Sequence, residues 1–257
     1  MEDKGVLGEF CAEIYKEESF DGCFKIFEKY VKKLGFDGAC YTFIPKVQIK
    51  DISFVNPVFA KTENFPMSFL EDYEKKQLHN HDFTIRKGKE NTKDRYWCWR
   101  ETELSGDLNQ KEIDLIKLAR EKHGITNAIS IPTLVTDLVL SGASFVSSKQ
   151  DKEFNQLKKE SLETLLIVTK LFHDRNYAGS KLVQIFSKPL SEKLNPTEYK
   201  TLELLTKGYK TKQLAEKLNV TDKSAKNIVS NLCKKLGGIN RDQLFFLIGR
   251  INLLQFS

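Results

Sequence analysis

The sequence predicts an α+β protein, with an N-terminal body built on an antiparallel sheet and a smaller all-α C-terminal domain. Apolar residues in positions 1–173 switch between the spacing of helices and the alternation of strands, whereas positions 194–257 show helical spacing alone. A chain of 257 residues with 40% hydrophobic content can bury the cores of one or two domains. We therefore expect two domains of different fold class.

The expected elements of the N-terminal body alternate along the chain. Helical spacing is found at Phe10–Tyr15, Phe24–Leu34, Ser68–Leu78, Asn109–Lys122 and Glu153–Phe172. Strand-like alternation is found at Ala39–Ile44, Val55–Ala60, Ala128–Pro132 and Leu138–Val146. Helices that bracket such strands predict an α/β/α sandwich with an antiparallel sheet. A body of this kind can enclose a small-molecule pocket between sheet and helices.

Residues 174–193 are expected to link the body to the C-terminal domain. The segment holds the small and turn-forming residues Gly179, Ser180, Ser187, Pro189 and Ser191. An apolar stretch at Leu182–Phe186 suggests a partly ordered linker. The expected domains are therefore 1–173 and 194–257.

The C-terminal domain has the pattern of a helix-turn-helix. Asn195 is placed to cap a first helix, Pro196 suits its first turn, and Glu198 can reach back to the cap. Gly208 ends that helix, a short second helix follows, and a third runs from near Asp222 to the glycines at 237–238. In this motif the last of these helices enters the major groove of DNA.

The third helix has an apolar face and a basic face. The apolar stripe consists of Ala225, Ile228, Val229, Leu232 and Leu236, and the opposite side carries Lys223, Lys226, Asn227, Ser230 and Lys234. Lysine attracts phosphates and can donate to guanine, and asparagine can form two hydrogen bonds to adenine. An amphipathic helix with a solvated basic face would show the same pattern.

Charge favours nucleic acid as the partner of this domain. Residues 187–257 hold 13 Lys and Arg against 6 Asp and Glu, whereas the preceding 186 residues hold 28 against 29. A neutral body with a basic domain is the electrostatic footprint of phosphate binding. A membrane surface is a weaker alternative, because the basic residues alternate with apolar ones instead of forming a block.

The C-terminal segment resembles the DNA-binding domain of LuxR-type transcription factors. The resemblance spans about fifty residues, and its matching positions are Leu194, Pro196, Glu198, Leu202, Gly208, Leu214, Ala215, Leu218, Val220, Ser224, Lys226, Asn231, Lys235, Leu236 and Arg241. The resemblance implies that Lys226, Asn227 and Ser230 face the bases, with Ser224 beside them. It also implies a homodimer with one contact on the last helix, where Leu244, Leu247, Ile248 and Ile251 form an apolar stripe.

A second set of residues resembles the ligand site of acyl-homoserine-lactone receptors of the same family. The set consists of Asn64, Phe65, Pro66, Phe69, Tyr73 and Asp82, followed by Trp97 and Trp99. The resemblance implies that Asp82 accepts the amide N–H of a ligand, that Tyr73 donates to an acyl carbonyl, and that a tryptophan walls the ring. Spacing from Asp82 selects Trp97, whereas the local aromatic-x-Trp pattern selects Trp99. Ser144, on an expected strand, is a further candidate to bond an acyl oxygen.

Three positions depart from the family pattern. Phe69 stands where receptors have a tryptophan that donates to the lactone carbonyl, Phe65 stands where a tyrosine is common, and Ala128 replaces a glycine. Each missing polar group costs about 1–3 kcal/mol if its ligand partner stays buried and unpaired. The ligand then lacks that carbonyl, or binds shifted, or is not a lactone. We expect a weak or absent response to ordinary acyl-homoserine lactones.

Other interpretations of these residues stay open at this point. The aromatic residues can be ordinary core, Asp82 can be a helix cap or a turn residue, and Ser144 can be a plain strand serine. His79 and His81 flank Asn80 without a distant Cys or His partner, so no metal site or cofactor is expected. The five cysteines are scattered and form no CxxC, which is typical of reduced cytosolic thiols.

The sequence therefore predicts a ligand-responsive bacterial transcription regulator that binds double-stranded promoter DNA as a homodimer. Its expected partners are a small-molecule signal, DNA and RNA polymerase, without a membrane, and its expected location is the cytoplasm. The alternative is a ligand-free relative that forms heterodimers with another regulator. An enzyme fused to a DNA-binding domain is disfavoured, because the sequence has no G-x-S-x-G elbow, P-loop or metal set.

Overall fold

The structure is a computed structural model that describes residues 3–45, 48–49, 52–53, 58–90, 93–136, 139–178, 194–236 and 238–251. These residues divide into two units. The larger unit contains residues 3–44 and 58–178, and the smaller unit includes residues 194–251.

A five-stranded sheet forms the centre of the larger unit, with the strand order β4-β1-β7-β6-β5. Its strands are β1 (Gly38–Pro45), β4 (Val58–Lys61), β5 (Trp97–Cys98), β6 (Asn127–Val135) and β7 (Val139–Ser147). Antiparallel pairing joins β1 to β4, β5 to β6 and β6 to β7. Two shorter strands, β2 (Gln48–Ile49) and β3 (Ile52–Ser53), pair with each other.

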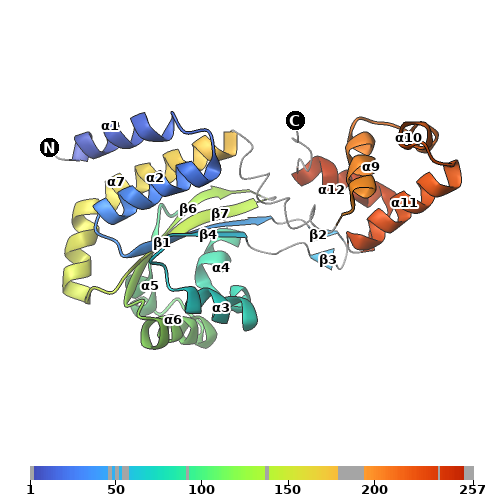
Figure 1. The fold of residues 1–257 in the computed structure, drawn as a ribbon. Coiled ribbons are helices and arrows are strands. Elements are labelled where there is room, and N and C mark those ends of the chain that lie inside the picture. Colours follow the sequence, from blue (N-terminus) through green and yellow to red (C-terminus); the bar gives the residue numbers. More distant parts are fainter. Residues whose placement is uncertain are drawn as a thin grey trace. The chain divides into compact units, whose positions relative to one another are not determined.

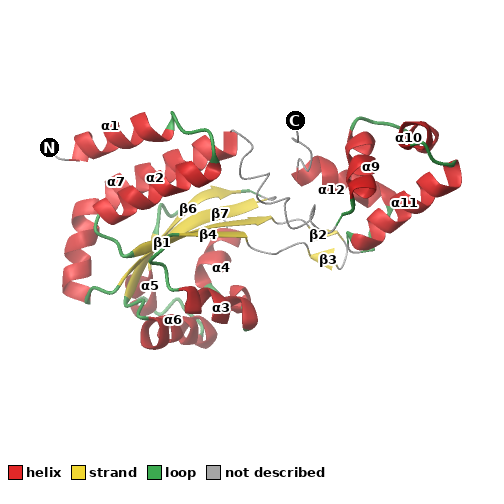
Figure 2. Cartoon of the chain, in the orientation of Figure 1, coloured by secondary structure: helices red, strands yellow, loops and turns green. Residues whose placement is uncertain are grey.

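Helices cover both faces of this sheet (Figures 1 and 2). One face carries α1 (Asp3–Ile14), α2 (Phe20–Lys33) and α7 (Asp151–Ala178). The other carries α3 (Met67–Lys75), the 3-10 turn η1 (Leu78–His81), α4 (Phe83–Lys89), α5 (Trp99–Leu104) and α6 (Gln110–His123). The predicted α/β/α sandwich with an antiparallel sheet is confirmed.

The two faces of the sheet bury different kinds of core. Towards α2 and α7 the core is an aromatic cluster, in which the rings of Phe27 and Phe172 stack with centroids 4.5 Å apart and Phe145 lies 5.8 Å from Phe27. The His173 ring is buried there too, 2.7 Å from the Tyr41 hydroxyl, and burial lowers its pKa to about 4. The opposite face carries the residues of the candidate pocket.

Local sequence signals account for several helix ends. Asn109 caps α6 by accepting from the backbone N–H of Glu112, whose side chain accepts in return from the N–H of Asn109. Gly124 ends α6 with φ +69°, a conformation that costs glycine little. Ser19 is the N-cap of α2, and its hydroxyl oxygen accepts a hydrogen bond from the backbone N–H of Gly22.

Within the smaller unit, the described residues of 194–251 form four helices: α9 (Pro196–Thr206), α10 (Thr211–Leu218), α11 (Asp222–Lys235) and α12 (Arg241–Ile251). The predicted capping box of Asn195 and Glu198 is present, and Gly208 has φ +83° just after α9. Thr221 caps α11, and Asn219 takes the left-handed conformation in the turn before it. The predicted order of three helices around two turns is confirmed.

Several predicted boundaries differ from the structure. Helix α1 begins at Asp3, not Phe10, and α3 ends at Lys75 because Gln77 takes a left-handed conformation with φ +50°. Helix α7 continues to Ala178, so the linker does not begin at Asp174. The rest of the predicted linker, residues 179–193, lies outside the described residues, as do 55–57 and 138 of two predicted strands.

Candidate functional site

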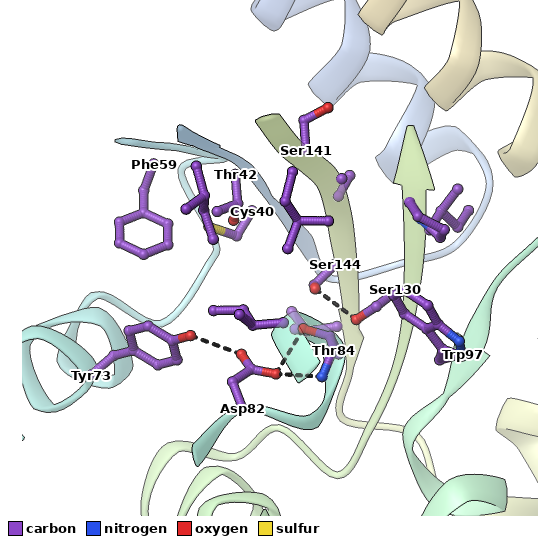
Figure 3. A pocket seen from close by; sticks show the side chains of 18 of the residues that line it. Cys40, Thr42, Phe59, Tyr73, Asp82, Thr84, Trp97, Ser130, Ser141 and Ser144 are labelled. Carbon is purple, nitrogen blue, oxygen red and sulfur yellow. Dashed lines mark hydrogen bonds between the residues drawn. The ribbon is translucent and has the colours of Figure 1, made fainter. Parts of the chain in front are cut away.

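A cavity lies between the sheet and helices α3, α4 and α5 (Figure 3). It contains about 740 Å³ of space outside the protein atoms, part of which is open solvent. Small-molecule sites commonly have mainly apolar walls, as this cavity does. Every residue that the sequence assigned to the pocket lines this cavity: Phe65, Phe69, Tyr73, Asp82, Trp97, Trp99 and Ser144.

Asp82 is the centre of one polar group in the cavity (Figure 3). Its Oδ2 accepts a hydrogen bond from the Tyr73 hydroxyl at 2.8 Å. Its Oδ1 accepts from the backbone N–H and the hydroxyl of Thr84 at 2.8 and 2.7 Å. Asp82 is therefore the N-cap of α4 and also lines the cavity, and its contact with a ligand stays a prediction.

Tyr73 orients Asp82. Burial, together with the Asp82 carboxylate, raises the pKa of Tyr73, so the phenol keeps its proton. That single proton is donated to Asp82 and is not free for an acyl carbonyl while this bond exists. The sequence-based role of Tyr73 as a direct donor to the ligand therefore does not fit the hydrogen bonds of this structure.

Both tryptophans line the cavity, and both indole N–H groups are already bonded to protein. Trp97, on β5, donates to Asp94 at 2.9 Å, and Trp99, at the start of α5, donates to Ser130 at 2.9 Å. Their exposed fractions are both 6%. The choice that the sequence left open between Trp97 and Trp99 has no single answer, because each forms part of the wall.

A second polar group lies on the sheet side of the cavity. The hydroxyls of Ser130 on β6 and Ser144 on β7 are 2.7 Å apart, in a directly paired register. Figure 3 shows both side chains at the cavity. Close by on β7, Gly142 lies so near β6 that a Cβ atom would come within 2.7 Å of the Ile131 carbonyl oxygen. This position therefore requires glycine.

The remaining wall is aromatic and aliphatic. The ring centroid of Phe69 lies 6.3 Å from that of Phe65 and 5.8 Å from that of Tyr73. The ring centroids of Phe59 and Tyr73 are 5.7 Å apart. Phe65 and Phe69 are only 4% and 5% exposed. Neither can form the hydrogen bonds that the family pattern would place there, so this part of the cavity is apolar.

The lining residues that sequence reasoning missed include Cys40, Phe59, Thr84 and Ser130. Thr84 was open to prediction, because an aspartate two residues before a threonine is typical of a helix start. Ser130 was not, since its role depends on cross-strand pairing with Ser144. Cys40 is a buried thiol whose pKa burial raises to about 12, so it stays neutral. Among the described residues no group of three His, Cys, Asp or Glu is placed to hold a metal ion.

The smaller unit presents a basic surface along α11. Lys223, Lys226, Asn227, Ser230 and Lys234 are all exposed, whereas Ala225, Val229 and Leu232 are buried. These three lysines form no ion pair with other described residues, in contrast to Lys235, which lies 2.7 Å from Glu198. Ser224 is half-buried, and its hydroxyl lies 2.9 Å from that of Thr221 in the helix cap. Ser224 thus helps to begin the helix.

Two family models match the chain and define its class. The autoinducer binding domain matches residues 19–176, and the model of bacterial regulatory proteins of the luxR family matches residues 192–248. The protein therefore belongs to the LuxR-type transcription regulators with an autoinducer-binding domain, and not to an enzyme family. None of the helices among the described residues is long and apolar enough to cross a membrane.

Solved structures with the same fold include those of SdiA. The crystal structure of Escherichia coli SdiA is 17% identical, with a TM-score of 0.52, and the alignment covers 96% of this chain and 97% of that one. SdiA in complex with octanoyl-rac-glycerol is 16% identical, with a TM-score of 0.52 and coverage of 99% and 96%. A search of curated proteins finds no match. At these identities the likeness shows the fold.

Proposed function

We propose that the protein is a ligand-responsive regulator that binds promoter DNA as a homodimer and takes an acyl-type signal into its N-terminal cavity. One observation carries the ligand part. Among its lining residues the largely apolar cavity has a single carboxylate, Asp82, which has no ion-pair partner among the described residues. An apolar chain fits the walls, and an N–H or O–H donor on the ligand fits the carboxylate. SdiA, which has the same fold, was solved in complex with octanoyl-rac-glycerol, a compound with an acyl chain.

Ligand and DNA binding are coupled in this proposal through the stability of the ligand domain. A ligand that binds the folded domain stabilises it by mass action and favours the conformations to which it binds best. A cytoplasmic location and contact with RNA polymerase at promoters belong to the same proposal. The direct test is DNA binding by the full chain, measured with and without acyl compounds of six to twelve carbons.

The second candidate is a ligand-free partner of another regulator. It is favoured by Phe65 and Phe69, which make the cavity wall apolar at two positions where the family pattern is polar. The exposed basic face of α11 favours direct DNA binding instead. If purified protein binds no acyl compound and binds DNA only when mixed with a second regulator, this candidate replaces the first.

Lys223 and Lys234 are expected to act through DNA phosphates. Changing either to alanine should weaken binding about equally on all sequences and reduce the slope of log K against log salt by about one, because each lysine displaces about one counterion. Lys159→Ala, an exposed lysine of the ligand domain, is the matched control and should leave the slope unchanged. An unchanged slope in both α11 variants would show that DNA lies on another face.

The bases are expected to be read by Lys226, Asn227 and Ser230. Their exposure on one side of α11, together with the helix-turn-helix order, supports this assignment.

The burial of the residues of α12 changes which of them we propose for the dimer contact. Leu244 is fully buried in its own unit, whereas Phe245 and Phe246 are 38% and 47% exposed. The side chains of Leu247, Ile248 and Ile251 lie outside the described residues.

Phe246→Asp is expected to reduce operator affinity at least about tenfold. A charge on an apolar contact surface disfavours the dimer, and a monomer loses the second half-site. Sedimentation and DNA binding of the full chain measure both effects. Leu104→Asp, at a 71% exposed leucine of the other unit, controls for added charge. A variant that stays dimeric with full operator affinity would place the dimer contact elsewhere.

A further inference from the structure

A group of polar side chains is buried between the sheet and α7, in a core that is otherwise aromatic. Its members come from four elements: Tyr41 on β1, Thr133 on β6, Ser141 on β7 and His173 on α7. All four are buried, and His173 is only 1% exposed. The neighbouring ring of Phe172 has its centroid 5.2 Å from that of Tyr41. We call these four polar residues the histidine cluster.

The hydrogen bonds of the histidine cluster fit a neutral imidazole. The Tyr41 hydroxyl lies 2.7 Å from Nδ1 of His173, and the Ser141 hydroxyl lies 3.5 Å from the same nitrogen. Burial raises the pKa of Tyr41, so the phenol keeps its proton. Its oxygen also contacts the hydroxyls of Ser141 and Thr133, which can donate to it. Tyr41 therefore donates to Nδ1, and the single ring hydrogen of His173 is on Nε2.

A second proton on His173 has no anion to balance it in this position. The charged groups that act on the ring are Lys170 and Asp174, both on α7, and they pair with each other at 2.9 Å. Arg175, also on α7, donates to backbone carbonyls instead. The strands contribute the uncharged members of the cluster, and α2 contributes phenylalanine rings. Burial, followed by the charge of Lys170, therefore lowers the pKa of His173 to about 4.

The C-terminal turns of α7 contain other features that bear on their release. The ring of His173 stacks on that of Tyr177, with centroids 5.3 Å apart, and Tyr177 is 43% exposed. The side chain of Asn176 is fully buried, and its Oδ1 has no hydrogen-bond partner among the described residues. Water can satisfy this oxygen once the helix end leaves the sheet. A short movement of these turns therefore gives both His173 and Asn176 access to water.

We propose that the histidine cluster is an acid-sensitive clasp, in which protonation of His173 releases residues 169–178 of α7 from the sheet. The charged ring regains water only by leaving the cluster, so acid favours the released state. The chain runs from the end of α7 to the DNA-binding unit. Each residue that leaves the helix lengthens this covalent path by up to about 2 Å, because an extended residue spans ~3.5 Å and a helical one ~1.5 Å. Acid thereby loosens the connection between the two units, whether or not a ligand is bound.

The sign of the pH dependence follows from the two states of the ring. The pKa of His173 is about 4 in the closed cluster and 6.5, the ordinary value, after release. Above pH 6.5 both states are neutral, so the pH has no effect on the opening of the clasp. As the pH falls from 6.5 to about 4, only the released state takes up the proton, and opening becomes steadily more favourable. Between pH 7.5 and 5.5 the equilibrium constant for opening should rise about tenfold.

Hydrogen exchange of the full-length protein, read by mass spectrometry at pH 7.5 and 5.5, tests this inference. After correction for the intrinsic exchange rate, the protection of backbone amides in 169–178 should fall about tenfold in acid, whereas that of β6 and β7 should change less. His173→Asn keeps an oxygen that can accept from Tyr41 and cannot take up a proton, so its α7 amides should lose this pH dependence. His81→Asn, a histidine on the other side of the sheet, is the matched control and should behave like the wild type.

A nuclear magnetic resonance titration of the wild-type ring tests the clasp without any substitution. The His173 signal of the closed protein should remain that of a neutral imidazole at pH 5.5. A folded protein in which this ring takes up its proton near pH 6.5 would overturn the inference. An equal pH dependence of the α7 amides in His173→Asn, or an equal loss of protection in α7, β6 and β7, would overturn it as well.

Discussion

Asp82→Ala should lower the affinity for an acyl amide by about tenfold to a hundredfold. The change removes the carboxylate, and hydrogen bonds to charged groups are worth about 1.5–3 kcal/mol. It also removes the N-cap of α4, which accepts from Thr84 N–H at 2.8 Å, at a cost of about 1 kcal/mol of stability. The Tyr73 hydroxyl loses its acceptor as well. Binding and stability should therefore fall together.

Asp82→Asn separates the two effects. Asparagine caps helices about as well as aspartate, and its single carbonyl oxygen can still accept from Thr84. Stability in thermal unfolding should therefore stay close to that of the wild type, whereas amide affinity should still fall, because the charged acceptor is gone. Calorimetry with N-cyclopentyl octanamide measures the binding. An Asp82→Asn protein with wild-type affinity would show that the ligand does not use this carboxylate.

The residues of the cavity were predictable where spacing along one segment decides their position. Phe65, Phe69 and Tyr73 follow helical spacing into α3, and Asp82 comes at the start of the next helix, so a short stretch of chain carries much of the wall. The capping boxes at Asn109 and Asn195 have the same local character. Fold class, helix order and the main wall residues therefore follow from local pattern.

What the sequence left undecided depends on contacts between distant segments. Whether Tyr73 donates to a ligand or to Asp82 is a matter of side-chain geometry, and so is the contact between the hydroxyls of Ser130 and Ser144. Short elements were missed for a related reason. Helices α4 and α5 contain seven and six residues and β5 contains two, which is too short for periodicity to distinguish helix from strand. Tertiary packing determines their conformation.

An ion pair that the sequence pattern did not predict joins α4 to α6. The Arg86 guanidinium bonds to both carboxylate oxygens of Glu112 on α6, at 2.7 and 3.2 Å, and donates to the Asp107 carbonyl at 3.0 Å. The carboxylate of Glu112 is 2% exposed, and its hydrogen bonds raise the pKa of Arg86 above the usual value. Helix α4 also carries Thr84 and Ile85, which line the cavity. The Arg86–Glu112 ion pair therefore helps to hold this part of the cavity wall in position.

Arg86→Ala is expected to destabilise the ligand domain by about 3 kcal/mol. The change leaves the buried Glu112 carboxylate without its cation, and breaking one side of a buried pair typically costs ~3–5 kcal/mol. The lower value applies because Arg86 itself is 32% exposed and the Asn109 N–H still donates to Glu112. Urea unfolding of the full chain, followed by a tryptophan signal from the ligand domain, measures the loss.

Glu112→Gln is the matched control for this prediction. Its amide oxygen can still accept from Asn109 and Arg86, and the arginine left without a carboxylate can reach water and Glu90, 3.2 Å away. The cost should therefore be about 1 kcal/mol, and Arg86→Ala combined with Glu112→Gln should be more stable than Arg86→Ala alone. Arg86→Ala and Glu112→Gln are compared by their loss in free energy of unfolding. If the loss for Arg86→Ala is no larger than that for Glu112→Gln, then the unpaired buried carboxylate is not the cause of the destabilisation.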